Sequence, residues 1–183
     1  MSPIIASDTG GNFRPPPEGL YNAVVVDVVD HGIQQTQFGP KHKVSLRFQL
    51  DEIHPDTGKR FVVARRYTLS LNQKATLRLH AEALRGKKFT KRELAGFDLE
   101  QLMGLGCQVQ IVHNTTDDGR TFGNVQACVP LSKGMRPLEP LDYVRVQDRP
   151  ENGSSPAEAG GDDTDPDDGH DPDGPAAQQS MGI

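Results

Sequence analysis

Apolar residues in this chain fall in short runs, most of them alternating with polar residues and separated by turn sequences. Residues 20–29 (LYNAVVVDVV) are rich in β-branched residues and apolar on both faces, which predicts a strand buried within the sheet. Residues 43–50 alternate strictly between polar and apolar side chains. A third strand is predicted from residue 59 to about residue 69, after the turn sequence HPDTG at residues 54–58. These three strands form a predicted meander.

A helical period follows the meander. Residues 72–84 carry apolar side chains at helical spacing, with Asn72 predicted to cap the first turn and Gly86 to end the helix. The sequence TKRE at residues 90–93 predicts a capping box, and DLEQ at residues 98–101 predicts a second short helical piece.

Two further strands complete the pattern. Residues 107–113 alternate again, and residues 120–129 form the last predicted strand across an Asp118-Gly119 turn. The order β-β-β-α-β-β predicts a mainly β protein with an OB-fold, a five-stranded barrel with a helical insertion between its third and fourth strands. An open α+β sheet is the structural alternative.

Charge divides the chain into two regions. Residues 1–150 hold all 20 lysines and arginines against 16 acids, whereas residues 151–183 hold nine acids and no base. The second region is rich in Gly, Pro, Asp and Ser and has few apolar residues, so we expect it to be disordered. The predicted organisation is a flexible arm at residues 1–17, an OB-fold nucleic-acid-binding domain at residues 18–149, and a disordered acidic tail at residues 150–183.

Several function classes find no support in the sequence. No run of 18 apolar residues and no signal-peptide pattern occur, so we expect a cytoplasmic protein with no membrane partner. Cys107 and Cys128 lie in apolar runs and are predicted to be buried and reduced. The histidines and cysteines lack metal-ligand spacing, so we expect no metal, no cofactor and no enzymatic activity. Asp27 and Asp30 are interpreted as a polar strand edge, because an acid pair lacks a third ligand.

Basic residues are concentrated in the middle of the chain. Residues 41–92 contain 14 bases and four acids, which favours a polyanionic partner. In an OB-fold, a single strand commonly binds along the second and third strands, where bases neutralise phosphates and aromatic rings stack on nucleobases. The bases Lys87, Lys88, Lys91 and Arg92 are interpreted instead as a solvated helix surface.

The candidate nucleic-acid-binding residues share a place on the second or third predicted strand or beside it. They are Phe38, Lys41, Lys43, Arg47, Lys59, Arg60, Arg65, Arg66, Tyr67, Arg120 and Phe122. Phe38 and Tyr67 are the candidate stacking residues, and core packing is the alternative for Tyr67 and Phe122.

Several sequence blocks resemble small proteins encoded in phages and prophages. The blocks are residues 17–21 (PEGLY), 26–30 (VDVVD), 36–41 (TQFGPK), 86–90 (GKKFT), 96–99 (GFDL) and 124–134. Their layout is similar to that of OB-fold single-stranded DNA-binding proteins of phage replication and recombination modules. The resemblance covers residues 15–136 and implies binding to single-stranded DNA. Bacterial single-strand binding proteins typically end in an acidic stretch with a Pro-Phe recruiting tip, whereas this sequence ends in QQSMGI, so recruitment through such a tip is not expected.

The leading hypothesis is a non-enzymatic protein that covers single-stranded DNA during phage replication or recombination, in the host cytoplasm. The acidic tail is a candidate site for recruiting replication or recombination proteins, and self-association into a homo-oligomer is a further candidate interaction. The alternative hypothesis is an OB-like adaptor that binds a protein of the same machinery, with its bases serving only as surface charge. Both DNA and RNA are candidate ligands.

Overall fold

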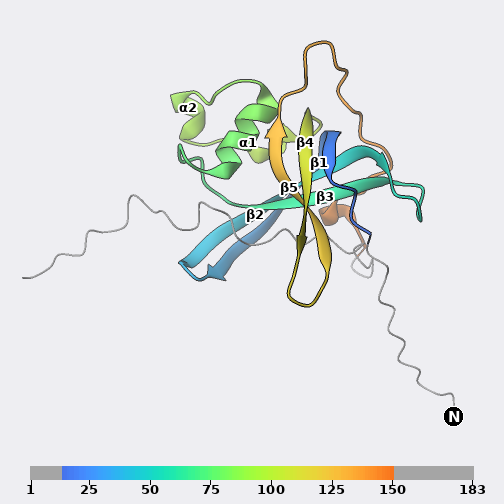
Figure 1. The fold of residues 1–183 in the computed structure, drawn as a ribbon. Helices are drawn as coiled ribbons and strands as arrows, with labels where there is room; N and C mark the ends of the chain where they lie inside the picture. The colour runs from blue at the N-terminus through green and yellow to red at the C-terminus, as the bar shows by residue number, and fades with distance from the viewer. Residues whose placement is uncertain (1–13, 151–183) are drawn as a thin grey trace, which may run out of the picture.

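The computed structural model describes residues 14–150, which form a five-stranded antiparallel sheet in the order β3-β2-β1-β4-β5 (Figure 1). The strands are β1 (Gly19–Thr36), β2 (Gly39–Ile53), β3 (Arg60–Thr68), β4 (Gly106–Thr115) and β5 (Thr121–Val129). Between β3 and β4 lie the helices α1 (Thr76–Arg85) and α2 (Lys91–Leu94) and the 3-10 helix η1 (Leu99–Leu102), and η2 (Val146–Asp148) follows β5. The mainly β class and the helical insertion are confirmed. The predicted acidic tail and most of the predicted N-terminal arm lie outside the described residues.

The sheet is not closed, so the closed barrel of the sequence prediction is not formed. β3 and β5 are its two edges, and no ladder joins them. β1 is central: it pairs with β2 along most of its length and with β4 through residues 19–24. This position explains why its apolar residues are buried on both faces of the sheet.

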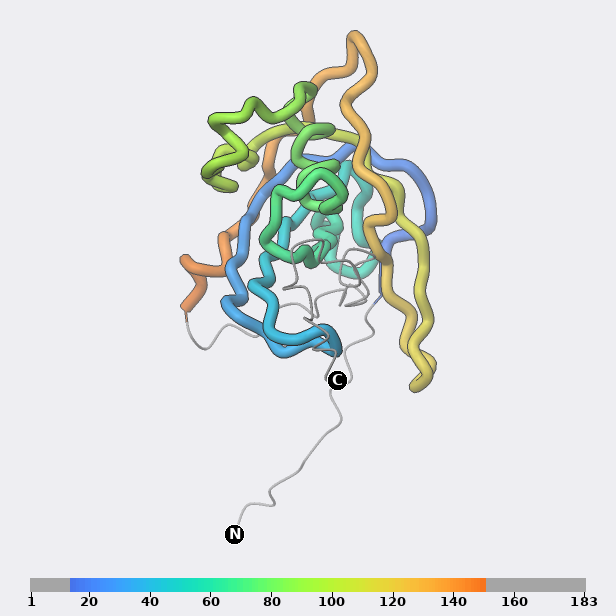
Figure 2. The backbone as a smooth tube through the Cα atoms, turned by 90° about the vertical axis from the view of Figure 1, so that its left-hand side faces the viewer, coloured from blue at the N-terminus to red at the C-terminus, as the bar shows by residue number. Residues whose placement is uncertain are grey.

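Two hairpins project from the sheet toward the same end of the molecule (Figures 1 and 2). The β1–β2 hairpin extends past the point where β3 begins to pair, because β3 reaches only Lys43 of β2. Register shifts between Val25 and Asp27 and between Asp30 and Gly32 interrupt the ladder between β1 and β2. The second hairpin joins β4 and β5.

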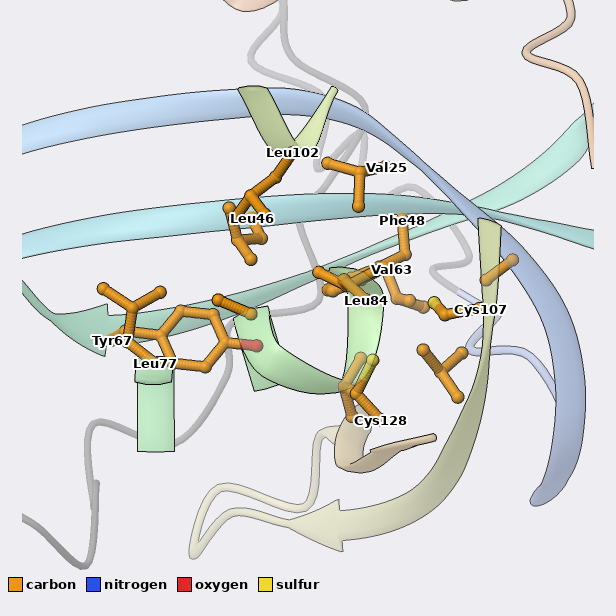
Figure 3. Packing of buried hydrophobic residues seen from close by; sticks show 14 of the residues in the cluster. Val25, Leu46, Phe48, Val63, Tyr67, Leu77, Leu84, Leu102, Cys107 and Cys128 are labelled. Carbon is orange, nitrogen blue, oxygen red and sulfur yellow. The ribbon is translucent and has the colours of Figure 1, made fainter. Parts of the chain in front are cut away.

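The core lies between the inner face of the sheet and α1 (Figure 3). Phe48 and Val63 contribute from β2 and β3, and Leu77 and Leu84 contribute from the apolar face of α1. Gly86 adopts a left-handed conformation with φ 66° and ends α1 as predicted. The helix begins later than predicted.

Asn72 forms a turn before α1 instead of capping the helix. Its carbonyl accepts a hydrogen bond from the Ala75 amide at 3.0 Å, and its side chain accepts one from the Lys74 amide at 3.3 Å.

Both cysteines are buried in the core, Cys107 on β4 and Cys128 on β5, and neither forms a disulfide. A hydrogen bond with Cys128 and burial raise the pKa of the Cys107 thiol.

One side chain connects the two edges of the open sheet. Arg65 shares a strand face with Phe61, Val63 and Tyr67, so it points inward, and its guanidinium donates a hydrogen bond to the carbonyl of Val125 on β5. The same guanidinium lies 5.6 Å from the centre of the Tyr67 ring. Arg65 therefore spans the gap that a backbone ladder would close in a barrel.

We expect the Arg65→Met substitution to lower the free energy of unfolding by about 1–2 kcal/mol, because it leaves the partly buried carbonyl of Val125 without this donor. Urea denaturation followed by circular dichroism measures the change. Lys59→Met, at an exposed position in the turn before β3, is the control and should change stability little. Equal midpoints for the two variants would contradict the structural role of Arg65.

Candidate nucleic-acid interface

The outer face of β2 and β3, opposite the core, carries the polar side chains that the alternation predicts. On β2 these are Lys43, Ser45, Arg47 and Gln49, which pair in register with Thr68, Arg66, Ala64 and Val62 of β3. Because strand residues alternate between faces, Arg65 and Arg66 point in opposite directions. Only Arg66 of these two lies on the predicted binding face.

Residues 137–149, here called the C-terminal strap, cross this outer face after the chain leaves β5 (Figure 1, orange). Gln49 fixes the strap with two hydrogen bonds: its amide donates to the Leu141 carbonyl at 2.6 Å, and its side-chain oxygen accepts from the Leu141 amide at 2.8 Å. Arg60 donates to the Glu139 carbonyl at 2.7 Å. Side chains of β2 and β3 thus satisfy backbone groups of a segment that has little secondary structure of its own.

The beginning of the strap packs closely on the start of β4. A β-carbon built on Gly106 would lie 3.0 Å from Cβ of Pro137 and 3.1 Å from a methyl group of Leu131. The absence of a side chain at Gly106 therefore allows this approach.

Asp27 anchors the other end of the strap. Its side chain lies at a register shift of β1 and is 1% exposed. The carboxylate accepts hydrogen bonds from the Tyr143 hydroxyl at 3.1 Å, from Nε of Arg145 at 3.0 Å and from the Val146 amide at 2.8 Å. The interpretation of Asp27 as a polar strand edge is therefore wrong: it is a buried acid that holds three groups of the strap.

Arg145 extends the anchor to the helical insertion. Its guanidinium also donates to Glu100 of η1 at 2.7 Å. Hydrogen bonds to the carboxylates of Glu100 and Asp27 raise the pKa of Arg145, so it stays charged. The strap is thus tied to β1, β2, β3 and η1.

Two of the predicted phosphate-binding residues are buried on the outer face of β2. Lys43 is 3% exposed and donates to the Thr68 hydroxyl at 2.9 Å. Arg47 is 5% exposed and lies opposite Asp27 in the ladder. In this conformation neither side chain is accessible to a phosphate. Periodicity assigned both residues to the outer face, but it carried no information on what covers that face.

Two further predicted residues belong to the interior. Tyr67 is 0% exposed, and its hydroxyl hydrogen-bonds Nδ1 of His80 at 2.8 Å, so the core alternative applies and the ring is not available for stacking. Arg65 faces the core and binds Val125. Phe122, at the start of β5, is half-buried.

The remaining predicted residues are at least partly exposed and lie mainly at turns. Phe38 is 52% exposed at the tip of the β1–β2 hairpin, close in sequence to Lys41. Lys59 is exposed in the turn before β3, whereas Arg66 and Arg60 are half-exposed. The exposed Arg120 forms an ion pair with Asp118 at 3.2 Å in the β4–β5 turn. The structure therefore separates the predicted set into a covered group and a peripheral group.

The most concentrated exposed positive charge lies elsewhere, on and before α2. We define the basic helical cluster as Lys87, Lys88, Lys91 and Arg92, all of which are exposed. The sequence interpretation treated these residues as an ordinary solvated helix surface. The sequence feature that could have indicated a binding surface is their density, four bases within six residues without an acid.

Residues 14–150 contain neither a candidate metal-binding group nor a candidate membrane-spanning helix. In this part of the chain, no group of three or more His, Cys, Asp or Glu side chains is arranged to hold a metal ion. No helix among the same residues is long and apolar enough to cross a membrane. No protein-family model and no curated protein sequence matches the chain.

We expect the Asp27→Asn substitution to lower the free energy of unfolding by about 2–3 kcal/mol, because it leaves Arg145 with a weaker partner and removes one acceptor from the strap. It should also expose the strap to proteases, with cleavage mapped by mass spectrometry to residues 137–149. Asp51→Asn, at an exposed end of β2, is the matched control. Unchanged stability and unchanged cleavage of the Asp27 variant would contradict the anchoring role.

Proposed function

We propose that this protein is a non-enzymatic single-stranded DNA-binding protein that covers exposed strands in phage replication or recombination, acting in the host cytoplasm. Exposed positive charge is the observation that carries the proposal. Two acids close to the exposed bases of residues 87–92 are already engaged, Glu82 by Arg78 and Glu93 by Arg85. The cations left at the surface are then available to the phosphates of a polyanion.

The strand order supports an OB-like fold within this proposal. An OB barrel joins its strands in the cyclic order 3-2-1-4-5 and places its helix between the third and fourth strands. The sheet of this protein has that order, opened between β3 and β5, with Arg65 spanning the opening. OB-folds frequently bind oligonucleotides, which adds to the argument from charge.

One observation favours a second candidate function, that of an adaptor for a protein partner. The outer face of β2 and β3 already holds an extended polypeptide, through the paired hydrogen bonds between Gln49 and Leu141 and the bond from Arg60 to Glu139. A surface of this shape and polarity can accept an extended peptide of another protein in place of the strap.

We expect the full chain to bind a fluorescent single-stranded oligonucleotide with an affinity that falls as salt rises. The slope of log K against log salt should be about −0.7 for each phosphate contact. Parallel titrations with duplex DNA and RNA of the same sequence measure selectivity, and we expect the single-stranded DNA to bind most tightly. Absence of binding at low salt would refute the proposed function and favour the adaptor.

Deletion of residues 151–183 should tighten DNA binding by about tenfold at low salt, because it removes nine acids that compete with phosphates for the basic surface. Competition titrations of the full and shortened chains measure the difference. A full-length chain with these nine acids changed to Asn or Gln is the control for length and should bind like the deletion. Equal affinity of all three chains would contradict the competitive role of the tail.

A further inference from the structure

The basic helical cluster is built on an ordered turn rather than on independent surface side chains. Its four bases occupy residues 87–92, from the end of α1 into α2. Beneath them, the guanidinium of Arg85 lies 4.4 Å from the ring centre of Phe89 and 4.8 Å from that of Phe97. The two rings pack edge to face with centres 4.9 Å apart. This stack fixes the backbone that carries the exposed bases.

A capping box fixes the same turn from the other side. The Thr90 hydroxyl accepts a hydrogen bond from the Glu93 amide, and the Glu93 carboxylate accepts one from the Thr90 amide at 2.8 Å. Glu93 also receives the guanidinium of Arg85. The hydrogen bond from the Thr90 backbone is the main reason that the pKa of Glu93 is lowered. Because the backbone is held in place, binding orders only the side chains.

The acids beside the cluster form ion pairs with arginines outside the cluster. Glu82 accepts hydrogen bonds from Nε of Arg78 at 3.1 Å and from the Phe89 amide at 3.2 Å. Burial alone would raise the pKa of Glu82, but these hydrogen bonds and the nearby charges of Arg78 and Lys88 lower it. Arg78 thus offsets Glu82, and Arg85 offsets Glu93. The positive charge of the exposed cluster is left largely uncompensated.

We propose that the basic helical cluster is the principal contact surface for the phosphates of single-stranded DNA, in place of the outer face of β2 and β3. This inference rests on the proposed function and assigns its binding surface. The strap is hydrogen-bonded to Gln49 and Arg60 of the outer face, and Lys43 and Arg47 are buried on that face. All four bases of the cluster are exposed. The rings beside the cluster, Phe89 and Phe97, are engaged with Arg85. The contacts are therefore phosphate contacts without base stacking, and they tolerate any sequence.

The basic helical cluster lies apart from the interface predicted from the sequence, so the two surfaces can be tested separately. Both views place α2 at the end of the molecule away from the tips of the β1–β2 and β4–β5 hairpins (Figures 1 and 2). The exposed bases of the predicted interface belong to those hairpins, to the turn before β3 and to β3 itself. Substitutions in one group therefore leave the other group intact.

The test is a full-length variant carrying Lys87→Gln, Lys88→Gln, Lys91→Gln and Arg92→Gln, titrated with a fluorescent oligothymidine over a salt series. We expect its affinity to fall by at least about tenfold at low salt, and its salt slope to become shallower by about 0.7 for each phosphate that the variant no longer neutralises. A variant with the three lysines changed to Arg and Arg92→Lys keeps the charge and should bind like the parent.

The matched control removes four bases of the predicted interface by Lys41→Gln, Lys59→Gln, Arg66→Gln and Arg120→Gln. It changes the net charge equally, so we expect only a small decrease in affinity if the cluster is the binding surface. An unchanged affinity of the cluster variant, or an equal or larger decrease in the control, would overturn the inference while leaving the proposed function standing. If the parent chain does not bind the oligonucleotide, the proposed function itself fails.

A measurement on the unsubstituted protein tests the inference without any variant that could misfold. Lysine acetylation mapped by mass spectrometry, with and without the oligothymidine, reports which amines the DNA protects. We expect protection at Lys87, Lys88 and Lys91 and none at Lys59. Protection at Lys59 without protection at the cluster would overturn the inference independently of any substitution.

Discussion

The organisation of this protein depends on the buried carboxylate of Asp27. A buried charge is tolerated only when its acceptors are satisfied, and Asp27 meets this requirement with Tyr143, Arg145 and the Val146 amide. All three donors belong to the end of the described chain, so satisfying Asp27 brings the strap back across the sheet. Gln49 meets the same requirement through the backbone of Leu141. These hydrogen bonds therefore hold the strap against a face of the sheet that the strand pattern alone would leave open to solvent.

This closure changes where binding chemistry can occur. The sequence predicts that a ligand binds the outer face of β2 and β3, whereas here the strap is hydrogen-bonded to Gln49 and Arg60 of that face. The basic helical cluster is not subject to this constraint, because its neighbouring acids are paired with Arg78 and Arg85 and its bases remain in solvent. The protein thus contains both buried basic residues, such as Lys43 and Arg47, and exposed basic residues on and before α2.

Local patterns predicted the elements well because they report on short-range physics. Apolar runs and two-residue alternation located the strands, the capping box at Thr90 and Glu93 formed as expected, and Gly86 ended α1. The prediction that Asn72 caps α1 was wrong, because its side chain accepts a hydrogen bond from the Lys74 amide in a turn before the helix begins. Alternation also implied that Arg65 and Tyr67 lie on the same face as the apolar Phe61 and Val63. The assignment of Arg65 and Tyr67 to a binding face ignored that implication. Whether β3 and β5 pair to close the sheet depends on strands distant in sequence, and no local pattern reports that they remain unpaired.

The sequence by itself determined the order of strands and helices, the face on which most polar and apolar residues lie, and the separation of basic and acidic regions. These properties follow from periodicity and composition, which act over a few residues. Tertiary structure alone decided that Lys43 and Arg47 are buried and that Tyr67 binds His80. The reason is that burial of a polar side chain depends on partners far away in the chain: the carboxylate of Asp27 meets Arg145, 118 residues later, only once the sheet and the strap have come together.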